Sequence, residues 1–292
     1  MNFSAIILLS AALFSSSMSS CNKSQSFEEG DKSVTQLDMK NVSYGSDTAQ
    51  KMDVYLPQGR NTDSTKIIVF IHGGSWSGGD KSEFDDAIVA VKKQLTDYAI
   101  FNINYRLLRA GGCNRFPTQI DDVKSALSFI NSKSAEFKIN PEKIVLIGAS
   151  AGAHLALLQA YKNNDDKKIK AVVDLFGPAD LKDLYNNHPV HAASRPVLLA
   201  LLGATPTTNA ALYTDASPIN YVTGATVPTK IFHGKEDVIV PIAQSIALKE
   251  KLQANNVLVD LTTYPTEGHG WYAANLLDTY AKTINFIKEN VH

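Results

Sequence analysis

Cysteine is scarce in this chain of 292 residues, and neither sign of charge is in excess. The two cysteines, Cys21 and Cys113, lie in very different contexts, so a disulfide framework is not expected. The 28 Lys and Arg residues almost balance the 29 Asp and Glu residues, which gives a formal net charge of −1. This balance argues against a surface for nucleic acid and against an acidic disordered tail.

Metal-binding motifs and long apolar runs are also missing. The sequence contains no HExxH motif and no paired CxxC motif, so we expect no metal site. After residue 20, no segment offers eighteen uninterrupted apolar residues, so no later segment is expected to span a membrane. Hydrophobic residues still make up 44% of the chain, which is enough for a large buried core.

Residues 1–20 have the features of an export signal. An apolar run at 3–14 is too short to span a bilayer as a mature helix, and a serine-rich stretch follows it. The sequence Ser19-Ser20-Cys21, with Met18 at the usual Leu position, resembles a bacterial lipobox. That resemblance implies cleavage before Cys21, lipidation of its thiol, and an exported lipoprotein of the periplasm or outer membrane. Simple secretion, with an incidental thiol at Cys21, is the alternative.

The rest of the chain divides into a polar tether at 21–34 and one folded domain at 35–292. In that domain, strand-like and helix-like segments alternate, which predicts an α/β fold with a mainly parallel sheet and helices on both faces. The stretch 180–217 has three prolines and no convincing strand, so we expect a small cap insertion there. Strands are expected at 36–42, 52–56, 66–71, 99–104, 143–147, 171–176, 229–233 and 257–264, the first two as an antiparallel pair. Helices are expected at 83–95, 117–133, 151–161, 242–253 and 273–290.

The pentapeptide GASAG at residues 148–152 lies between a predicted strand and a predicted helix. A serine on a tight strand-to-helix turn projects its hydroxyl outward, and its neighbours must be small for the backbones to fit. Ser150 is therefore a candidate nucleophile. On this motif alone, an ordinary turn between a strand and a helix is the alternative.

A second glycine-rich loop follows the predicted strand at 66–71 and has the sequence HGGSW at 72–76. Consecutive glycines allow backbone N–H groups to point toward a ligand, and the negative oxygen of a tetrahedral intermediate needs such donors. A flexible glycine turn is the alternative, but the nearby GASAG motif favours an oxyanion site.

A candidate acid and a candidate base follow the last two predicted strands. Asp237 lies in a turn after the strand at 229–233, where a carboxylate could orient a histidine; Glu236 is the rival acid, and a simple turn-forming role is the alternative. His269 lies between two glycines after the last strand and is the candidate general base. The order Ser150, Asp237, His269 is that of α/β-hydrolases. The other histidines are expected to be structural or solvent-exposed: His72, His154, His188, His191, His233 and His292.

Together these motifs resemble the hormone-sensitive-lipase-like and BD-FAE-like esterases of the α/β-hydrolase superfamily, over about residues 35–290. The resemblance implies the α/β-hydrolase fold and oxyanion donors at Gly74, Ser75 and Ala151. Ser75 stands where many relatives have a third glycine, and Ala153 replaces another frequent glycine. The motifs that carry the resemblance are HGGSW at 72–76, NYRL at 104–107, FP at 116–117, DD at 121–122, GASAGAHLA from 148 and HGKEDVIVP from 233.

These residues predict a serine carboxylic-ester hydrolase of the carboxylesterase or lipase type. His269 would accept the proton of Ser150, which attacks the ester carbonyl and forms an acyl-enzyme that water hydrolyses. No metal or organic cofactor is needed, and the expected substrate is a small-molecule or carbohydrate-linked ester. An aryl-formamidase with the same triad is one alternative. A surface lipoprotein that only binds a ligand is another. The membrane is expected as a partner only through the lipid at Cys21.

One charged residue is expected to support the site. Arg106 follows the predicted strand at 99–104, and Asp121 and Asp122 lie near the start of the next helix. We expect a partly buried ion pair that holds the loop below the site. A solvated arginine is the alternative.

Overall fold

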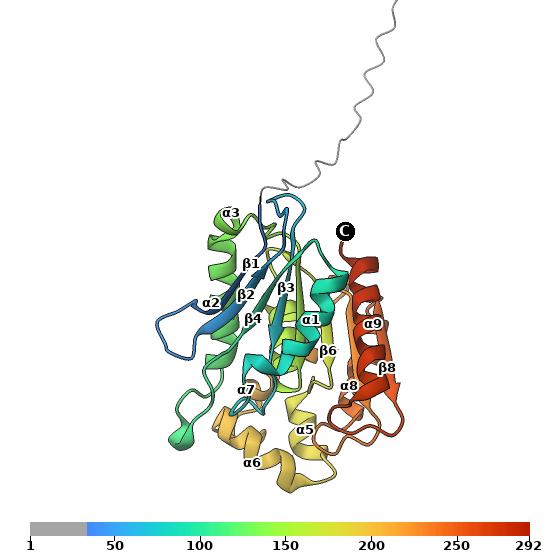
Figure 1. Cartoon of the computed structure of the whole chain (residues 1–292). Coiled ribbons are helices and arrows are strands. Elements are labelled where there is room, and N and C mark those ends of the chain that lie inside the picture. The colour runs from blue at the N-terminus through green and yellow to red at the C-terminus, as the bar shows by residue number, and fades with distance from the viewer. Residues whose placement is uncertain (1–33) are drawn as a thin grey trace, which may run out of the picture.

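The computed structural model describes residues 34–292, which form an eight-stranded sheet with helices packed against it (Figure 1). The predicted signal peptide, Cys21 and nearly all of the predicted tether lie outside the described residues. The strand order across the sheet is β1-β2-β4-β3-β5-β6-β7-β8. The strands are β1 (Leu37–Ser43), β2 (Lys51–Leu56), β3 (Lys66–Ile71), β4 (Tyr98–Ile103), β5 (Ile144–Ala149), β6 (Ile169–Leu175), β7 (Thr229–Gly234) and β8 (Val259–Tyr264).

The sheet is mainly parallel, as predicted. β1 pairs with β2 and β2 with β4 in antiparallel fashion, and every later neighbouring pair is parallel. β3 and β5 lie at the centre of the sheet and are almost continuously apolar. A strand covered by helices on both faces has no solvent side and therefore no alternation of polar residues.

Helices cover both faces of the sheet, which confirms the predicted layers. The helices α2, α4 and α8 pack on one face, and α1 and α9 pack on the other (Figure 1). Their bounds are α1 (Asp85–Gln94), α2 (Thr118–Ser132), α4 (Ala151–Lys162), α8 (Ala243–Ala254) and α9 (Ala273–Asn290); a single turn, α3 (Ser134–Phe137), follows α2.

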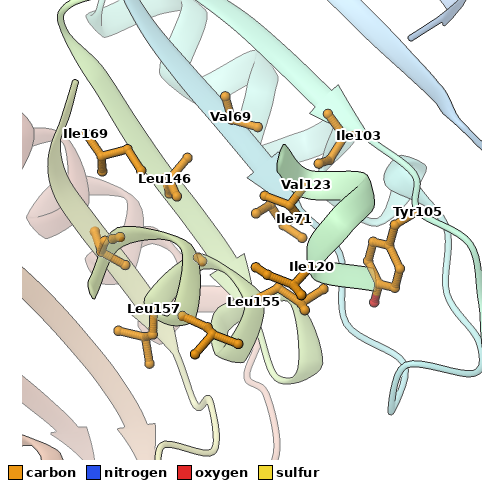
Figure 2. Packing of buried hydrophobic residues seen from close by; sticks show 14 of the residues in the cluster. Val69, Ile71, Ile103, Tyr105, Ile120, Val123, Leu146, Leu155, Leu157 and Ile169 are labelled. Carbon is orange, nitrogen blue, oxygen red and sulfur yellow. The ribbon is translucent and has the colours of Figure 1, made fainter. Parts of the chain in front are cut away.

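Two buried clusters fill the spaces between the sheet and these helices. Val69 of β3, Leu146 of β5 and Leu155 of α4 belong to one buried cluster, shown in Figure 2. Phe70 is the next residue of β3 and belongs to the other cluster, with Ile287 of α9, because successive side chains of a strand point to opposite faces. Each side chain buried in this way contributes about 1.5–3 kcal/mol to folding. The sheet is thereby fixed as a rigid platform.

The cap insertion at 180–217 is helical and contains no strand. Its helices lie at the end of the sheet where the parallel strands finish (Figure 1). The backbone N–H of Leu181 donates to Ser217 Oγ at 2.9 Å, and His188 Nε2 contacts the carbonyl oxygen of Ile239 at 3.1 Å. These bonds tie the cap to itself and to the body of the fold. Its helices are α5 (Leu181–Asn187), α6 (His191–Leu202) and α7 (Ala210–Asp215).

The described chain begins at the opposite end of the sheet. The carbonyl of Val34 accepts a hydrogen bond from the N–H of Gly59 at 2.8 Å, and Gly59 lies in the loop before β3. That loop is at the amino end of the parallel strands, whereas the cap is at their carboxyl end. Within residues 34–292, no helix is both long and apolar enough to cross a membrane.

Candidate active site

Ser150 occupies the tight turn between β5 and α4. Its backbone has φ 51° and ψ −115°, an unfavourable conformation for a residue with a side chain. Hydrogen bonds hold that conformation, because the Ser150 N–H donates to the Leu175 carbonyl at 2.8 Å and its own carbonyl accepts from His154 N–H at 3.0 Å. The flanking glycines are required, since a Cβ at Gly152 would collide with the carbonyl oxygen of Ile71. The turn therefore places Ser150 at the end of the sheet, where the residue is 8% exposed.

The three residues predicted as nucleophile, base and acid lie side by side. His269 Nε2 is 2.9 Å from Ser150 Oγ, and His269 Nδ1 is 2.7 Å from Asp237 Oδ2. Ser150 follows β5, Asp237 lies in the turn after β7, and His269 lies in the loop between β8 and α9. Parallel strands end at the same edge of the sheet, so residues far apart in the sequence meet there.

Asp237 is a buried carboxylate with several hydrogen-bond donors. Its Oδ1 accepts from the N–H groups of Ile239 at 2.8 Å and Val240 at 2.9 Å. Burial alone would raise the pKa of Asp237, but hydrogen bonds from His233, His269 and Val240 outweigh that effect and hold its pKa well below the usual range. The carboxylate is therefore ionised at neutral pH. An ionised acid beside the imidazole can stabilise a positive charge on His269.

Glu236, the rival acid, is exposed and makes no hydrogen bond to His269. The geometry therefore favours Asp237 over Glu236. None of the other histidines contacts Ser150 Oγ through a ring nitrogen.

The ring of Phe176 packs against His269, a contact that the sequence did not indicate. The two rings meet edge to face with centroids 4.7 Å apart, and Trp271 contacts Phe176 from another side at 5.2 Å. Phe176 follows β6 and has a positive φ of 48°, which is strained for a bulky side chain. Such strain persists only where the surroundings enforce it. Phe176 limits the movement of His269 on one side.

The glycine-rich loop at 72–76, here called the oxyanion loop, follows β3. Gly74, Ser75 and Trp76 all have positive φ values, so the loop turns sharply and Ser75 adopts a conformation that glycine would adopt more easily. Tyr105 Oη lies 3.1 Å from the carbonyl oxygens of both His72 and Gly73 and donates to them. These contacts hold the backbone at the start of the oxyanion loop.

A buried histidine fastens the other end of the oxyanion loop. The indole N–H of Trp76 donates to His154 Nδ1 at 3.3 Å, and His154 Nε2 lies 2.7 Å from the carbonyl oxygen of Ala216. That carbonyl can only accept, so Nε2 carries the hydrogen and Nδ1 is free to accept. Burial lowers the pKa of His154 to about 4 and keeps the ring neutral. His154 is structural, as predicted.

The N–H groups of Gly74, Ser75 and Ala151, the predicted oxyanion donors, make no hydrogen bond to another residue of the described chain. Ala151 is the first residue of α4, where a backbone N–H has no partner within the helix. The positive end of the helix dipole adds to the attraction for a negative oxygen. The three N–H groups therefore have no competing partner within the described chain and remain the predicted oxyanion donors.

A small cavity of about 40 Å³ opens onto Ser150 Oγ. The oxyanion loop forms one wall, and the cap forms another through side chains of α5 and α6. Besides Ser150, the cavity is lined by Ser75, Trp76, Pro178, Leu184, Ala193, Ser194, Val197, Leu198, Ile239 and Val240.

Comparison with known proteins identifies the family to which this fold and site belong. A model of the BD-FAE family matches residues 52–252, which is more than half of the chain. The chain belongs to the BD-FAE family. This BD-FAE member has the α/β-hydrolase fold that the sequence predicts, and esterases are among its relatives.

The relatives of this BD-FAE chain include esterases and a kynurenine formamidase. Esterase LipC of Mycobacterium tuberculosis is 28% identical over 82% of this chain and 60% of its own length. The kynurenine formamidase of Meyerozyma guilliermondii is 32% identical over 53% of this chain and 58% of its own. A solved structure described as a bifunctional GH43-CE protein of Bacteroides eggerthii is 29% identical with a TM-score of 0.73, covering 86% of this chain and 35% of that one. The chain thus spans less than two thirds of each of these three proteins.

Proposed function

We propose that the protein is a serine carboxylesterase that forms an acyl-enzyme through Ser150, His269 and Asp237. The observation that carries the proposal is the position of His269, whose ring nitrogens lie within hydrogen-bond distance of both Ser150 Oγ and Asp237 Oδ2. A ligand-binding protein has no need for a base beside a serine hydroxyl at the end of the sheet. The esterase relatives support the same reaction.

The first half of the reaction follows from this geometry. His269 Nε2 accepts the proton of Ser150 as Oγ attacks the ester carbonyl carbon. The carbonyl oxygen becomes negative and accepts hydrogen bonds from the N–H groups of Gly74, Ser75 and Ala151. The ionised Asp237 stabilises the imidazolium that forms on His269. The tetrahedral intermediate collapses when His269 gives the proton to the leaving alcohol.

The second half regenerates the serine. Water takes the place of the alcohol, gives a proton to His269 and attacks the carbonyl of the acyl-enzyme. The second tetrahedral intermediate uses the same oxyanion donors. It releases the carboxylic acid and returns the proton to Ser150. Each group in the site therefore acts in both halves of the reaction, and every proton transfer passes through His269.

The proposed substrate is a small-molecule ester or an ester on a carbohydrate. The likeness to the bifunctional GH43-CE protein supports the carbohydrate subclass. Export as a lipoprotein, with the lipid on Cys21, stays a proposal that rests on the lipobox sequence. An amide substrate is the second candidate, because the formamidase is more than 30% identical over half of this chain.

Covalent labelling with a fluorophosphonate probe tests the nucleophile directly. We expect one adduct, mapped by mass spectrometry to Ser150, and none in Ser150→Ala. Loss of a triad member commonly costs about 10⁴- to 10⁶-fold in kcat, and alanine fits this turn as well as serine. No adduct on the folded wild-type protein, or activity of Ser150→Ala within tenfold of wild type, would contradict the proposal.

Substrate comparison separates ester from amide hydrolysis. We expect kcat/KM for p-nitrophenyl acetate and acetylated xylan to exceed that for N-formylkynurenine. The reverse order would assign the protein to the formamidase reaction with the same residues in the same roles.

A further inference from the structure

A second histidine touches the carboxylate of Asp237. His233 lies in β7, where its side chain is fully buried. Its Nε2 is 2.8 Å from the carbonyl oxygen of Val240 and 3.3 Å from Asp237 Oδ2, and its Nδ1 is 2.6 Å from Ser245 Oγ in α8. His269 and His233 therefore meet the same carboxylate oxygen from two sides.

The partners of His233 determine where its hydrogen lies. The carbonyl of Val240 can only accept a hydrogen bond, so Nε2 must carry the hydrogen. In the neutral ring, Nδ1 then accepts the hydroxyl hydrogen of Ser245. The Nε2–H of His233 therefore donates to the Val240 carbonyl, and Asp237 Oδ2 lies 3.3 Å from the same nitrogen. The carboxylate oxygen thus lies beside a nitrogen that carries a hydrogen rather than a lone pair.

We propose that His233 is a positioning residue that holds the carboxylate of Asp237 ionised and aimed at His269. The inference rests on the proposed function. Asp237 Oδ1 is already held by two backbone N–H groups, so His233 is the one side chain other than His269 that contacts the carboxylate within the described chain. It restricts Oδ2 to one orientation and shares its negative charge.

Loss of this donor has two physical consequences. Burial opposes the charge of Asp237, and removal of the His233 N–H leaves fewer donors to balance that burial. The carboxylate also gains freedom to turn away from His269 Nδ1, which weakens the stabilisation of the imidazolium in the transition state. The substrate does not meet His233, so its binding is not expected to change. Removal of the His233 donor is therefore expected to lower kcat and to leave KM unchanged.

A second buried titratable group, Asp174, interacts with His233, and its effect on activity must be distinguished from the effect of His233. Asp174 in β6 is fully buried, burial raises its pKa to about 7, and His233 opposes that rise. Its Oδ1 accepts from the N–H of Gly177 at 2.7 Å, and it makes no hydrogen bond to Asp237. Measurements at pH values well above and below 7 distinguish an effect of Asp174 from one of His233.

The decisive variants are His233→Leu, which removes the donor, and His233→Gln, which retains an N–H near the position of Nε2. Wild type and variants are compared in kcat and KM on p-nitrophenyl acetate and in the low-field proton resonance of His269 Nδ1–H. We expect His233→Leu to lower kcat by about 10- to 100-fold, by analogy with the loss of hydrogen-bond partners behind metal-ligating residues. KM should stay within twofold, and the low-field resonance should weaken or move. His233→Gln should recover most of both signals.

His188 provides the matched control. It is also a buried histidine, and its Nε2 contacts the carbonyl of Ile239 in the same turn, but it makes no contact with Asp237. His188→Leu should leave the low-field resonance unchanged and kcat within threefold of wild type. Ser245→Ala is the second variant if His233→Leu does not fold, because it removes the group that holds Nδ1. We expect an intermediate loss of kcat at unchanged KM.

The possible outcomes distinguish a failure of the proposed esterase function from a failure of the positioning role of His233. Wild-type protein without esterase activity or labelling would remove the proposed function, while the resonance of His269 still reports on His233. An active wild type with kcat and resonance unchanged in His233→Leu, or in Ser245→Ala where the former does not fold, would overturn the positioning role alone. Equal losses in His188→Leu and His233→Leu would also overturn it.

Discussion

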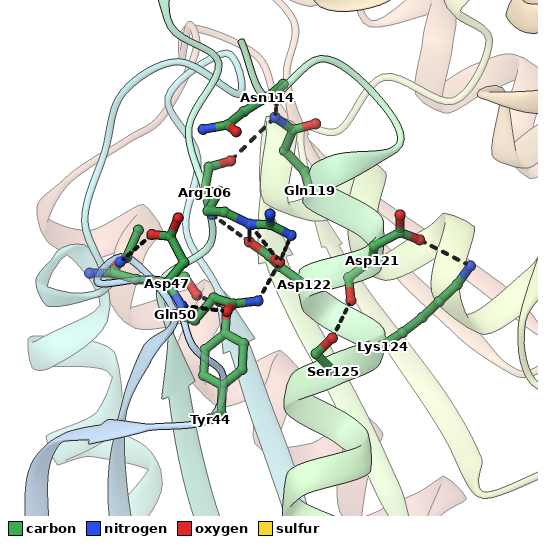
Figure 3. Close-up of polar contacts among 12 residues, drawn as sticks. Tyr44, Asp47, Gln50, Arg106, Asn114, Gln119, Asp121, Asp122, Lys124 and Ser125 are labelled. Atoms are coloured by element: carbon green, nitrogen blue, oxygen red, sulfur yellow. Dashed lines mark hydrogen bonds and ion pairs between the residues drawn. The ribbon is translucent and has the colours of Figure 1, made fainter.

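Arg106 donates hydrogen bonds to the buried carboxylate of Asp122 from both its guanidinium and its backbone N–H. Arg106 Nη2 is 2.6 Å from Asp122 Oδ1, and the Arg106 backbone N–H donates to Oδ2 at 2.7 Å (Figure 3). Gln50 donates to the same carboxylate at 2.7 Å. Asp121 makes no such contact and instead lies 3.6 Å from Lys124 on the surface. The predicted pairing is thus confirmed for Asp122 and wrong for Asp121.

Arg106→Met should destabilise the protein strongly, because it leaves the charge of Asp122 buried without its ionic partner. Removal of one member of a buried pair typically costs about 3–5 kcal/mol. We expect the loss in urea unfolding. Lys124→Met, which breaks the exposed pair with Asp121, is the matched control and should cost less than about 1 kcal/mol. Similar unfolding midpoints for the two variants would contradict the structural role of Arg106.

Asp237→Asn should abolish most of the activity while the fold remains. An amide at this position favours the wrong tautomer of His269, and the corresponding change in serine proteases lowers kcat by about 10⁴-fold. Glu236→Gln is the matched control, because Glu236 is adjacent in sequence but exposed. Kinetics on p-nitrophenyl acetate give the comparison. Greater damage from Glu236→Gln would mean that Asp237 is not the acid.

Asp174 should make stability fall as pH rises from about 4 to 7. Burial raises the pKa of its carboxyl from 3.8 to about 7, and its Oδ2 has no hydrogen-bond partner within residues 34–292. The folded state binds this proton more tightly than the unfolded state, so the contribution to stability is complete below pH 3.8 and is lost as pH approaches 7. Asp174→Asn removes the effect. Its stability relative to wild type should increase by about 1 kcal/mol per pH unit across that window.

Urea unfolding of both proteins at several pH values between 4 and 7 checks this prediction. Taking the difference cancels the titration of all groups that the two proteins share. A difference in unfolding free energy that does not change with pH would mean that the carboxyl is ionised in the folded protein.

Cys21→Ser should release active protein into the soluble fraction of the native host if lipidation anchors it. The described chain begins at the amino end of the parallel strands, whereas Ser150 lies at their carboxyl end, so a change at Cys21 is not expected to alter the site. Catalytic constants on small esters should therefore not change. Mass spectrometry of the N-terminal peptide provides the direct measurement. An unmodified Cys21 would exclude the anchor.

The arrangement of Ser150, Asp237 and His269 could be predicted from the sequence because each residue follows a strand with a recognisable sequence pattern. In a parallel sheet, that position alone brings them to one edge. The contacts of Phe176 and His233 could not be predicted from the sequence, since they depend on which side chains from other strands fill the adjacent space. For Asp122 a signal did exist. It lies four residues before Ala126 and eight before Ile130, on the buried side of α2, whereas Asp121 is turned about 100° away.

The insertion at 180–217 was predicted to be a cap over the site, but the residues of the cap that line the cavity became visible only in the structure. The side chains of Val197 and Leu198 in α6 reach the cavity at Ser150, and the next residue, Leu199, is exposed. A run of apolar residues that is buried on one side of a short helix gives no sequence signal of what it covers. The size of the cavity that would hold the acyl group can therefore be inferred only from how the side chains of the cap pack in the structure.

That packing predicts a preference for short acyl groups. A cavity of about 40 Å³ leaves little room beyond the carbon atoms of a small acyl chain. A longer acyl chain that enters this cavity must displace Val197 or Leu198, and forcing extra methylene groups into packed space costs about 1–3 kcal/mol. We expect kcat/KM to be at least tenfold higher for p-nitrophenyl acetate than for p-nitrophenyl octanoate.

Leu198→Ala should widen the cavity and reduce that preference, because Leu198 is buried against the site. Leu199→Ala is the matched control on the same helix, with a side chain that is 44% exposed and does not line the cavity. We expect the ratio of acetate to octanoate activity to fall at least fivefold in the first variant and to stay unchanged in the second. Val197→Ala serves if Leu198→Ala is too unstable to purify. A wild-type enzyme that prefers octanoate would mean that the acyl chain leaves Ser150 by another route, away from the cap.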